Sequence, residues 1–401
     1  MTRATGGVAV VVHSGGPTAV INASLLGVVE EARRHSMITG IYGARNGISG
    51  ILSEDFIDLE RQPAQTLAAV AHAPSSALGT SRREISQADI DRVLEIFRSY
   101  DIRFLFYTGG NGSMGTAWQI HKLALESGQA IQVVGIPKTI DNDLLETDHS
   151  PGYGSAARFF ACAVRDIGID NRALGGQVEV VEVLGRNVGW IAAATALARH
   201  RPDDAPHLIY LPETRLALEK LLEDVQQVYK RLGRCVVVVC EGQLDAEGQP
   251  FGADVRAGSR GELAMNLGHR LAMLIAERLK LRTRSEKPGL LGRSSASSVS
   301  ETDWNGARLC GRNAVLAAVQ GRGGSMVTLV RQPSGHFART DLVELDRVAY
   351  RERPFRAEWT NAAGNDILPA FCDYALPLTG EIAHHEQLVE IPVKRRATAP
   401  E

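Results

Sequence analysis

The sequence of 401 residues lacks an apolar run long enough to cross a membrane. The run Val8–Val12 near the N-terminus has only five residues, too few for a signal-peptide core, and no candidate of sufficient length follows it. The formal net charge of −2 also argues against a general attraction to nucleic acid or to a membrane surface. We therefore expect a cytoplasmic protein that binds neither, and any anion site must come from a local cluster of cations.

The sequence also lacks the motifs of several other chemistries. Its five cysteines show neither CxxC spacing nor a disulfide framework, which favours buried thiols in a reducing compartment. A Ser–His–Asp arrangement and a metal-ligand spacing of His and Cys are both missing. No GxGxxG motif follows the first apolar run, so a nicotinamide-dependent oxidoreductase is disfavoured.

What the sequence does contain is glycine placed directly after apolar runs. The run Val8–Val12 leads into the loop His13–Thr18, and the run Ile102–Tyr107 leads into Thr108–Ser113, each followed by a helical pattern. In such a unit the backbone N–H groups of the loop and the start of the helix present partial positive charge to a phosphate. The recurrence of the unit indicates a phosphate-binding α/β domain.

A third unit carries the densest chemistry in the chain. The apolar run Ile131–Ile136 reads as a buried strand that ends at Pro137, because proline cannot donate to a sheet ladder. Lys138, Thr139, Asp141 and Asp143 follow within six residues of that proline. Ligands of open α/β sheets bind at the carboxyl ends of strands, so this turn is the predicted centre of the site.

The second half of the chain predicts another α/β layer. Its expected strands Val178–Leu184 and Cys235–Cys240 end in Gly185-Arg186 and in Glu241. Helices are expected at Leu263–Leu281 and Thr302–Gln320, the last strand at Met326–Val330, and a frayed end at Arg395–Glu401. Because the chain is longer than one core usually supports, we expect about two α/β domains with mainly parallel sheets.

This set of residues suits phosphoryl transfer, which needs positioning and charge neutralisation more than covalent chemistry from the protein. Asp141 is the candidate base, Lys138 the candidate cation beside the leaving phosphate, and Asp143 a candidate ligand of Mg²⁺. Residues alone therefore predict an enzyme that acts on a phosphorylated ligand.

Several longer motifs together resemble the phosphofructokinase family, and in particular its pyrophosphate-dependent branch. They span about two thirds of the chain in family order. The matching stretches are SGGPTAVINAS (14–24), YTGGNGSM (107–114), GIPKTIDNDL (135–144), TDHSPGYGSAAR (147–158), VEVLGRNVGW (181–190), LIYLPE (208–213), CEG (240–242) and PGLLGRS (288–294).

The resemblance implies Mg²⁺-dependent transfer of a phosphoryl group to the 1-hydroxyl of fructose 6-phosphate, and a homodimer or homotetramer. It implies two Rossmann-like three-layer domains with mainly parallel sheets and an active site in the cleft between them. The expected divisions are 1–150 with part of roughly 294–345 for the donor phosphate, 151–293 with part of the C-terminal segment for the sugar phosphate, and an extension, 346–401, that packs on the body.

The resemblance also implies roles for particular residues. The implied catalytic residues are Asp141, Lys138 and Thr139, and the metal ligands are Asn111 and Asp143. The implied sugar-phosphate contacts are Thr139, Asp141, Leu184, Gly185, Arg186, Glu241, Arg284 and Arg293, with the last two arginines on the 6-phosphate. The implied donor contacts are Gly16, Arg82, Gly110, Asn111, Gly112, Ser113 and Lys138.

Some positions depart from the family pattern and leave the donor open between pyrophosphate and ATP. Gly112 stands where pyrophosphate enzymes commonly carry an Asp that fills the space of the ATP α-phosphate, whereas Lys138 is the residue typical of pyrophosphate enzymes. Asn111 replaces an Asp of the ATP enzymes, which weakens metal ligation there. We favour pyrophosphate, with ATP as the alternative donor.

On the sugar side, Leu290 replaces a His or Tyr, Gly292 a Gln, and Gln177 an Arg that reaches across a subunit interface. These changes bear on how the sugar phosphate is bound. They also keep open a non-catalytic, regulatory member of the family, against which the intact Asp141 and Asp143 argue. A lipid or NAD kinase of the wider superfamily is disfavoured by the PKTIDND stretch followed by Gly185-Arg186.

Overall fold

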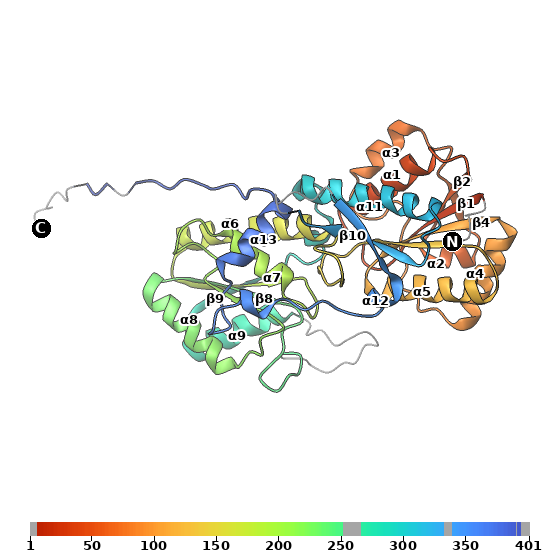
Figure 1. Ribbon diagram of the computed structural model, residues 1–401. Helices are drawn as coiled ribbons and strands as arrows, with labels where there is room; N and C mark the ends of the chain where they lie inside the picture. The colour runs from red at the N-terminus through yellow and green to blue at the C-terminus, as the bar shows by residue number, and fades with distance from the viewer. Residues whose placement is uncertain (1–5, 252–265, 333–338, 390, 394–401) are drawn as a thin grey trace, which may run out of the picture.

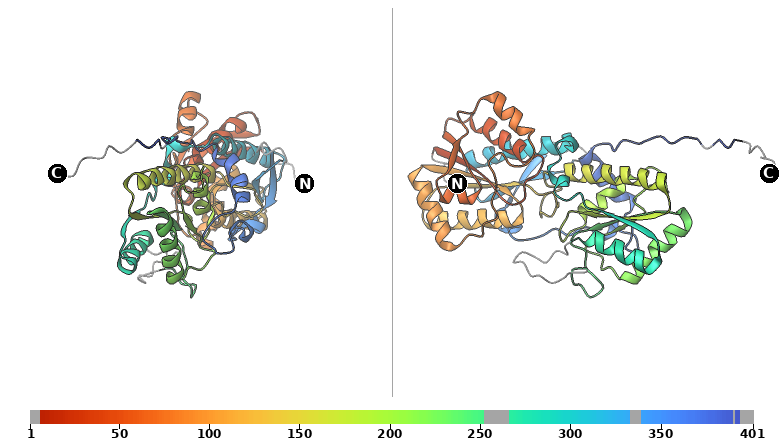
Figure 2. Two further views of the ribbon diagram at one scale, coloured as in Figure 1. Left: turned by 90° about the vertical axis from the view of Figure 1, so that its left-hand side faces the viewer. Right: turned by 180° about the vertical axis from the view of Figure 1, so that it is seen from behind.

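The computed structural model of the chain describes residues 6–251, 266–332, 339–389 and 391–393. Two α/β lobes lie side by side, each built around its own sheet (Figure 1). The view from behind shows the same division (Figure 2, right). The two-lobed α/β architecture with mainly parallel sheets confirms the predicted fold class.

The first lobe is organised by a seven-stranded sheet in the order β11-β10-β5-β4-β1-β2-β3. Pairing is parallel except at the two edges, where β2–β3 and β10–β11 are antiparallel. The strands are β1 (Gly7–His13), β2 (Ile38–Ala44), β3 (Phe56–Asp58), β4 (Ile102–Gly109), β5 (Gln132–Pro137), β10 (Ser325–Val330) and β11 (Arg339–Glu344).

Both faces of this sheet are covered by helices, which explains why its central strands are continuous apolar runs. Along β1, Val8, Val10 and Val12 join one core, and Ala9 and Val11 join the other. The first core packs under α2 (Ile48–Leu52), α4 (Gln87–Ser99), α5 (Asn111–Glu126) and α12 (Leu345–Val348), and the second under α1 (Ile21–Ala32), α3 (Ala64–Ala71) and α11 (Glu301–Val319).

The second lobe contains a parallel four-stranded sheet in the order β7-β8-β6-β9. Its strands are β6 (Gln177–Val183), β7 (Leu208–Tyr210), β8 (Cys235–Cys240) and β9 (Arg282–Glu286). One core lies under α6 (Tyr153–Leu174), α7 (Trp190–Ala194) and α13 (Pro369–Thr379), and the other under α8 (Leu218–Leu232) and α9 (Leu267–Leu279). The remaining short elements are η1 (Thr195–Ala198), α10 (Leu291–Ser294), η2 (Ala296–Ser298) and η3 (Ala357–Trp359).

Strand order places the ligand loops together. In the first sheet β1, β4 and β5 are neighbours, and β1 pairs with β2 on one side and with β4 on the other. The chain therefore reverses its direction of progress between β1 and β4, and such a switch point opens a crevice at the carboxyl ends of the strands. In the second sheet β6 and β8 are neighbours, so their terminal loops also meet.

Two of the strands that the sequence analysis missed, β9 and β11, are polar strands at sheet edges. Met326–Val330 is not the last strand, because β11 follows it as an antiparallel edge strand. The basic stretch that begins at Lys280 forms β9, an edge strand whose exposed residues alternate with partly buried ones. Polar edge strands give no apolar signal, which is why neither was predicted. Of the expected helix at 263–281, residues 263–265 lie outside the described residues, as do 395–401.

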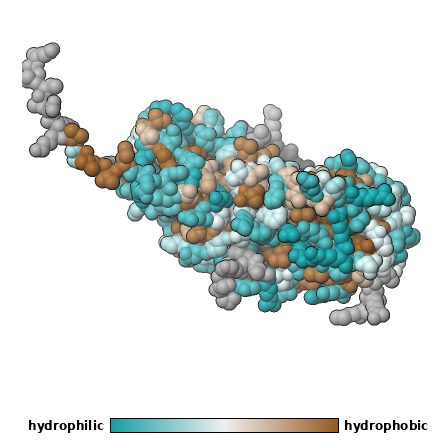
Figure 3. Space-filling model, turned by 90° about the horizontal axis from the view of Figure 1, so that it is seen from above, coloured by the Kyte–Doolittle hydropathy of each residue, from teal (hydrophilic) through white to brown (hydrophobic). Residues whose placement is uncertain are grey.

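The C-terminal segment crosses from the first lobe to the second and then leaves the body. Helix α13 packs on α6, and beyond it the segment carries the exposed apolar residues Leu388, Val389, Ile391 and Val393 (Figure 3). The five cysteines are free thiols, and Cys235, Cys240 and Cys310 are buried. None of the helices in the described parts of the chain is both long and apolar enough to span a bilayer.

Candidate active site

The described residues of the two lobes enclose a cavity of about 730 Å³. Its first-lobe wall consists of the loops that follow β1, β4 and β5, together with residues 81–85. Its second-lobe wall consists of the residues that follow β6 and β8, together with Leu290 and Arg293. The cavity is therefore where strand order predicts a ligand site in each lobe.

The loop after β1 is a glycine turn surrounded by cations. Gly15 has a φ of +79°, donates its N–H to Ser81 O at 3.0 Å, and would place a Cβ 3.2 Å from Lys138 Nζ. A Cβ on Gly16 would lie 2.9 Å from Arg293 Nη1 and 3.5 Å from Arg82 Nη2. Three cations therefore lie around this glycine turn, and the arrangement suits an anion.

The loop after β4 leads into α5, a helix of 16 residues whose first turn lines the cavity with Asn111, Gly112 and Ser113. Gly110 precedes the helix as its N-cap residue. A Cβ on Gly112 would meet nothing within 4 Å, so space remains beside this helix start. The free N–H groups at a helix start bind phosphate well, and here they face the same cavity as the glycine turn.

The loop after β5 holds the reactive side chains in place through its backbone. Lys138 N donates to Gly109 O at 3.0 Å, and Thr139 N donates to Pro151 O at 3.2 Å. Lys138 Nζ donates to Gly16 O at 2.7 Å, while Asp141 N donates to Thr139 Oγ1 at 3.1 Å. The loop is thus joined both to the β4 loop and to the glycine turn.

Burial tunes the two central charges toward neutral pH. Burial, and after it the neighbouring Asp143 carboxylate, raises the pKa of Asp141 to about 7. Burial lowers the pKa of Lys138 to about 8, against the opposing effect of the two aspartates. A carboxylate with a pKa near 7 can accept a proton at physiological pH and release it again, as a general base must.

Asp143 and Asn111 fit a divalent cation that also takes oxygen ligands from phosphate and water. Burial raises the pKa of Asp143, and its Oδ1 is a buried acceptor without a hydrogen-bond partner in the described residues. Asn111 Nδ2 donates to Asp143 Oδ2 at 3.3 Å, so the amide lies beside the carboxylate. The described residues contain no group of three or more His, Cys, Asp or Glu suited to a metal. Such a sparse set suits Mg²⁺, which keeps several water ligands.

On the second-lobe side, the turn after β6 is fitted closely to the strand end of β8. Gly185 and Arg186 have φ values of +142° and +51°, and Arg186 N donates to Glu241 Oε1 at 3.3 Å. A Cβ on Gly242 would lie 1.6 Å from Arg186 O, so glycine is required there. Burial raises the pKa of Glu241. Arg186 and Glu241 therefore both line this end of the cavity, and the backbone of the arginine fixes the carboxylate.

Most residues implied by the resemblance line this one cavity. They are Gly16, Arg82, Gly110, Asn111, Gly112, Ser113, Lys138, Thr139, Asp141, Asp143, Leu184, Arg186, Glu241 and Arg293. Gly185 contributes to the turn and not to the lining, and Arg284 lies outside the lining, exposed on β9 opposite Glu179.

The three positions that depart from the family pattern on the implied sugar side, Leu290, Gly292 and Gln177, lie in different surroundings. Leu290 lines the cavity and is exposed. Gly292 lies against Phe160, whose ring would be 2.3 Å from a Cβ at that position. Gln177 is buried in β6 and donates to Glu179 Oε1 at 2.8 Å. Only Leu290 can therefore contact a ligand in the cavity of its own chain.

Sequence analysis missed Arg353, which holds the β5 loop from the C-terminal segment. Its backbone N donates to Asp143 O at 2.7 Å, and its guanidinium donates to Asn142 O at 2.8 Å and Thr147 O at 2.7 Å. The same guanidinium lies 4.5 Å from the centre of the Trp190 ring. Arg353 thus links the loop that carries Asp141 to the aromatic core of the second lobe. No local motif in its stretch of sequence indicated this role.

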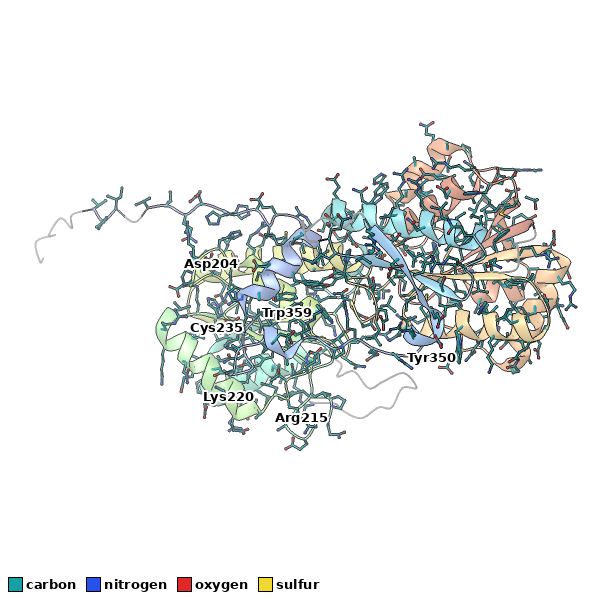
Figure 4. The ribbon with its side chains drawn as sticks, in the orientation of Figure 1. Asp204, Arg215, Lys220, Cys235, Tyr350 and Trp359 are labelled. Atoms are coloured by element: carbon teal, nitrogen blue, oxygen red, sulfur yellow. The ribbon has the colours of Figure 1, made fainter. Side chains whose placement is uncertain are left out.

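Tyr350 was also missed, and it lies where the C-terminal segment leaves the first lobe (Figure 4). Its ring covers α5 at Gly115, where a Cβ would come within 2.1 Å of it, and its hydroxyl accepts from Gln119 Nε2 at 3.0 Å. The residue has a φ of +58° and lines the cavity beyond Gly112. It forms one wall of the open space beside the start of the helix.

Comparisons with known proteins agree on one family. The family model described as phosphofructokinase matches residues 8–318. A pyrophosphate–fructose 6-phosphate 1-phosphotransferase of Rhodospirillum rubrum is 38% identical over 384 residues, which cover 93% of this chain and 94% of that protein. A protein of the same name from Xanthomonas campestris pv. campestris is 36% identical over 384 residues, with 91% of this chain and 90% of that protein covered. A solved pyrophosphate-dependent phosphofructokinase of Nitrosospira multiformis superimposes with a TM-score of 0.86 at 33% identity, over 98% of this chain and 99% of that one.

Proposed function

The chain belongs to the phosphofructokinase family, and we propose that it transfers a phosphoryl group from pyrophosphate to the 1-hydroxyl of fructose 6-phosphate. The products are fructose 1,6-bisphosphate and phosphate, and the proposed reaction runs in both directions. The observation that carries this proposal is the single cavity that joins the cationic glycine turn at Gly15–Gly16 to a carboxylate, Asp141, with a pKa of about 7.

In this mechanism the donor phosphates lie on the first-lobe side, against Gly16, Arg82, Lys138 and the start of α5. Asp141 accepts the proton of the sugar hydroxyl, and Thr139 supports it through the hydrogen bond from Asp141 N. Lys138 provides positive charge beside Gly16, where the leaving phosphate would develop negative charge. Glu241, Arg186 and Leu184 face the sugar from the second lobe.

Asn111 and Asp143 would hold Mg²⁺ in this scheme. When bound, Mg²⁺ supplies neutralising charge to the phosphate oxygens of the donor. The buried, unpartnered Oδ1 of Asp143 supports this assignment.

We further propose that the first lobe binds the donor and that the second binds the sugar phosphate. The donor side is lined by residues up to 143 and by Tyr350, and the sugar side by residues between 184 and 293. A homodimer or homotetramer would explain Arg284, which lies on the exposed edge strand β9, outside the cavity of its own chain. A place in glycolysis or gluconeogenesis, in the cytoplasm, follows from the proposed substrates.

ATP remains the second candidate donor because Gly112 leaves open space beside the start of α5. The assay that separates the two donors mixes the protein, Mg²⁺ and fructose 6-phosphate with either pyrophosphate or ATP. Turnover with pyrophosphate, and pyrophosphate formation from fructose 1,6-bisphosphate and phosphate, are the expected results. Turnover with ATP alone would replace pyrophosphate by ATP in the proposal. Absence of turnover with either donor, together with binding to an active homologue, would favour a regulatory subunit.

A further inference from the structure

Tyr350 is held on the surface of α5 at two points, although it belongs to the C-terminal segment (Figure 4). Its backbone N donates to Asn111 O at 3.2 Å, at the start of the helix, and its hydroxyl accepts from Gln119 Nε2 at 3.0 Å, about two turns further along. Between these points the ring covers Gly115, where a Cβ would lie 2.1, 2.4 and 2.5 Å from three of its carbon atoms. The ring therefore lies directly on the helix, in a place that glycine leaves free.

This part of α5 is one wall of the cavity. Positions 112, 115, 116 and 119 are three or four residues apart, which places them on one face of a helix. Gly112, Thr116 and Gln119 line the cavity, whereas Gly115 lies beneath the ring. The ring thus covers the face that Gly112 leaves open, about one helical turn beyond it.

The charge that suits phosphate lies at the other end of this wall. Lys138, Arg82 and Arg293 surround the glycine turn, and the start of α5 lines the same cavity. From Gly112 to Gln119 the helix carries no charged side chain. A donor of two phosphates therefore has partners for both of them between the turn and the helix start. A longer donor that follows α5 must continue past Gly112 over an uncharged surface.

On that surface the ring of Tyr350 is an obstacle. It moves the wall of the cavity inward at Gly115 by about 3.5 Å, the separation of carbon atoms in contact. The hydrogen bond between its hydroxyl and Gln119 keeps the ring from turning aside, and a tyrosine offers no positive charge to a third phosphate. A group that extends along α5 from the second phosphate meets this ring one turn after Gly112.

We propose that Tyr350 is a specificity residue for the donor, and that its ring disfavours any donor longer than two phosphates, ATP included. The inference rests on the proposed function. The C-terminal segment then provides the obstruction that an acidic side chain at position 112 would provide, so the open space beside Gly112 does not by itself admit ATP. The ring acts through its bulk, and loss of the hydroxyl alone should not change the choice of donor.

The test compares Tyr350→Ala and Tyr350→Phe, with Leu125→Ala as the control, because Leu125 is an exposed residue of the same helix outside the cavity lining. Steady-state assays with Mg²⁺ and fructose 6-phosphate give kcat/KM for ATP and for pyrophosphate. We expect the ratio of the first to the second to rise about tenfold or more in Tyr350→Ala, the order of discrimination that steric exclusion gives. In Tyr350→Phe and in the control the ratio should stay within about a factor of two of the parent.

A double variant tests whether Tyr350 and position 112 act on the same path along α5. If Tyr350→Ala opens this path, then Gly112→Asp added to it should close the path again and return the donor ratio toward that of the parent protein. A ratio that stays as high in the double variant as in Tyr350→Ala would place the effect of Tyr350 elsewhere and contradict the inference.

Equilibrium dialysis with ATP and Mg²⁺, without sugar, gives a second measurement that does not depend on turnover. Tighter binding of ATP to Tyr350→Ala than to the parent protein is the expected result. Weaker binding would mean that the ring is a stacking platform for the base, and would overturn the inference. A donor ratio that Tyr350→Ala leaves unchanged in a folded protein would overturn it as well.

Thermal unfolding of each variant separates a change of specificity from loss of the fold. If the alanine variant unfolds, Tyr350→Asn also removes the ring, and asparagine tolerates the φ of +58° at this position. If the parent protein shows no turnover with pyrophosphate, the proposed function fails. The dialysis of ATP with parent and variants still decides whether the ring of Tyr350 excludes the longer donor.

Discussion

The two sides of the cavity are built differently. The first-lobe side consists of three loops that follow adjacent parallel strands and are bonded to one another through backbone groups, as between Lys138 N and Gly109 O. The second-lobe side consists of two strand ends and the short helix α10, next to the exposed side chains of Leu290 and Leu291. The proposed donor side is therefore preformed within one chain, whereas the proposed sugar side is open. We therefore expect changes on the preformed side to lower kcat most, and changes on the open side to act mainly on the affinity for the sugar.

Asp141→Asn should give the largest effect. The amide cannot accept the hydroxyl proton, so we expect kcat to fall by about 10²–10⁴, the usual contribution of a general base. Steady-state rates with pyrophosphate and fructose 6-phosphate measure it. The matched control is Asp91→Asn, an exposed aspartate on α4 outside the cavity lining. A kcat within a factor of a few of the parent would remove Asp141 from the mechanism.

Lys138→Met should follow, with a loss in kcat of about 10²–10³, because the methionine keeps the volume but removes the charge beside Gly16. Lys122→Met, on the exposed face of α5, is the control. In the parent protein the pH profile of kcat/KM should rise through the pKa of Asp141, about 7, and fall through that of Lys138, about 8, since the base must be deprotonated and the cation protonated. An alkaline limb that persists in the methionine variant would assign that limb to another group.

The difference between the two sides also decided what could be predicted from sequence. The donor loops were predictable because each lies directly after its own strand, and because glycine and charge stand next to each other in the chain. Arg353 was not predictable, since its contacts with Asn142 and Thr147 join positions more than 200 residues apart. The position of Arg293 beside Gly16 likewise depends on how the lobes pack, which no local pattern encodes. Arg284 retains its implied role only as a prediction.

A smaller effect of Asp141→Asn is expected on stability. The buried carboxylates of Asp141 and Asp143 lie close together, so their negative charges destabilise the folded protein. The pKa of Asp141 is raised in the folded state, so the folded protein binds more protons than the unfolded chain between about pH 4 and about pH 7. Stability should therefore fall as the pH rises through this window in metal-free buffer. Asp141→Asn lacks this pH-dependent loss of stability, so its Tm should exceed that of the parent by a few degrees at pH 8 and match it near pH 4. If the difference in Tm between Asp141→Asn and the parent protein does not change with pH, the buried charge of Asp141 does not cause it. The control, Asp91→Asn, should have the Tm of the parent protein at every pH.

Gly112→Asp should change pyrophosphate turnover least, and it tests how far the donor side extends. A side chain at position 112 meets nothing within 4 Å, and an acid in the first turn of α5 is favoured by the helix dipole, so the fold should tolerate it. Pyrophosphate turnover should stay within about a factor of three, equal to about 0.7 kcal/mol. A donor that continues beyond its second phosphate must pass this carboxylate, so ATP turnover, or inhibition by ATP, should weaken at least tenfold. Gly112→Ala adds bulk without charge, so its turnover with ATP should lie between that of the parent protein and that of Gly112→Asp. If turnover with pyrophosphate falls as steeply as turnover with ATP, then pyrophosphate itself occupies the space beside Gly112.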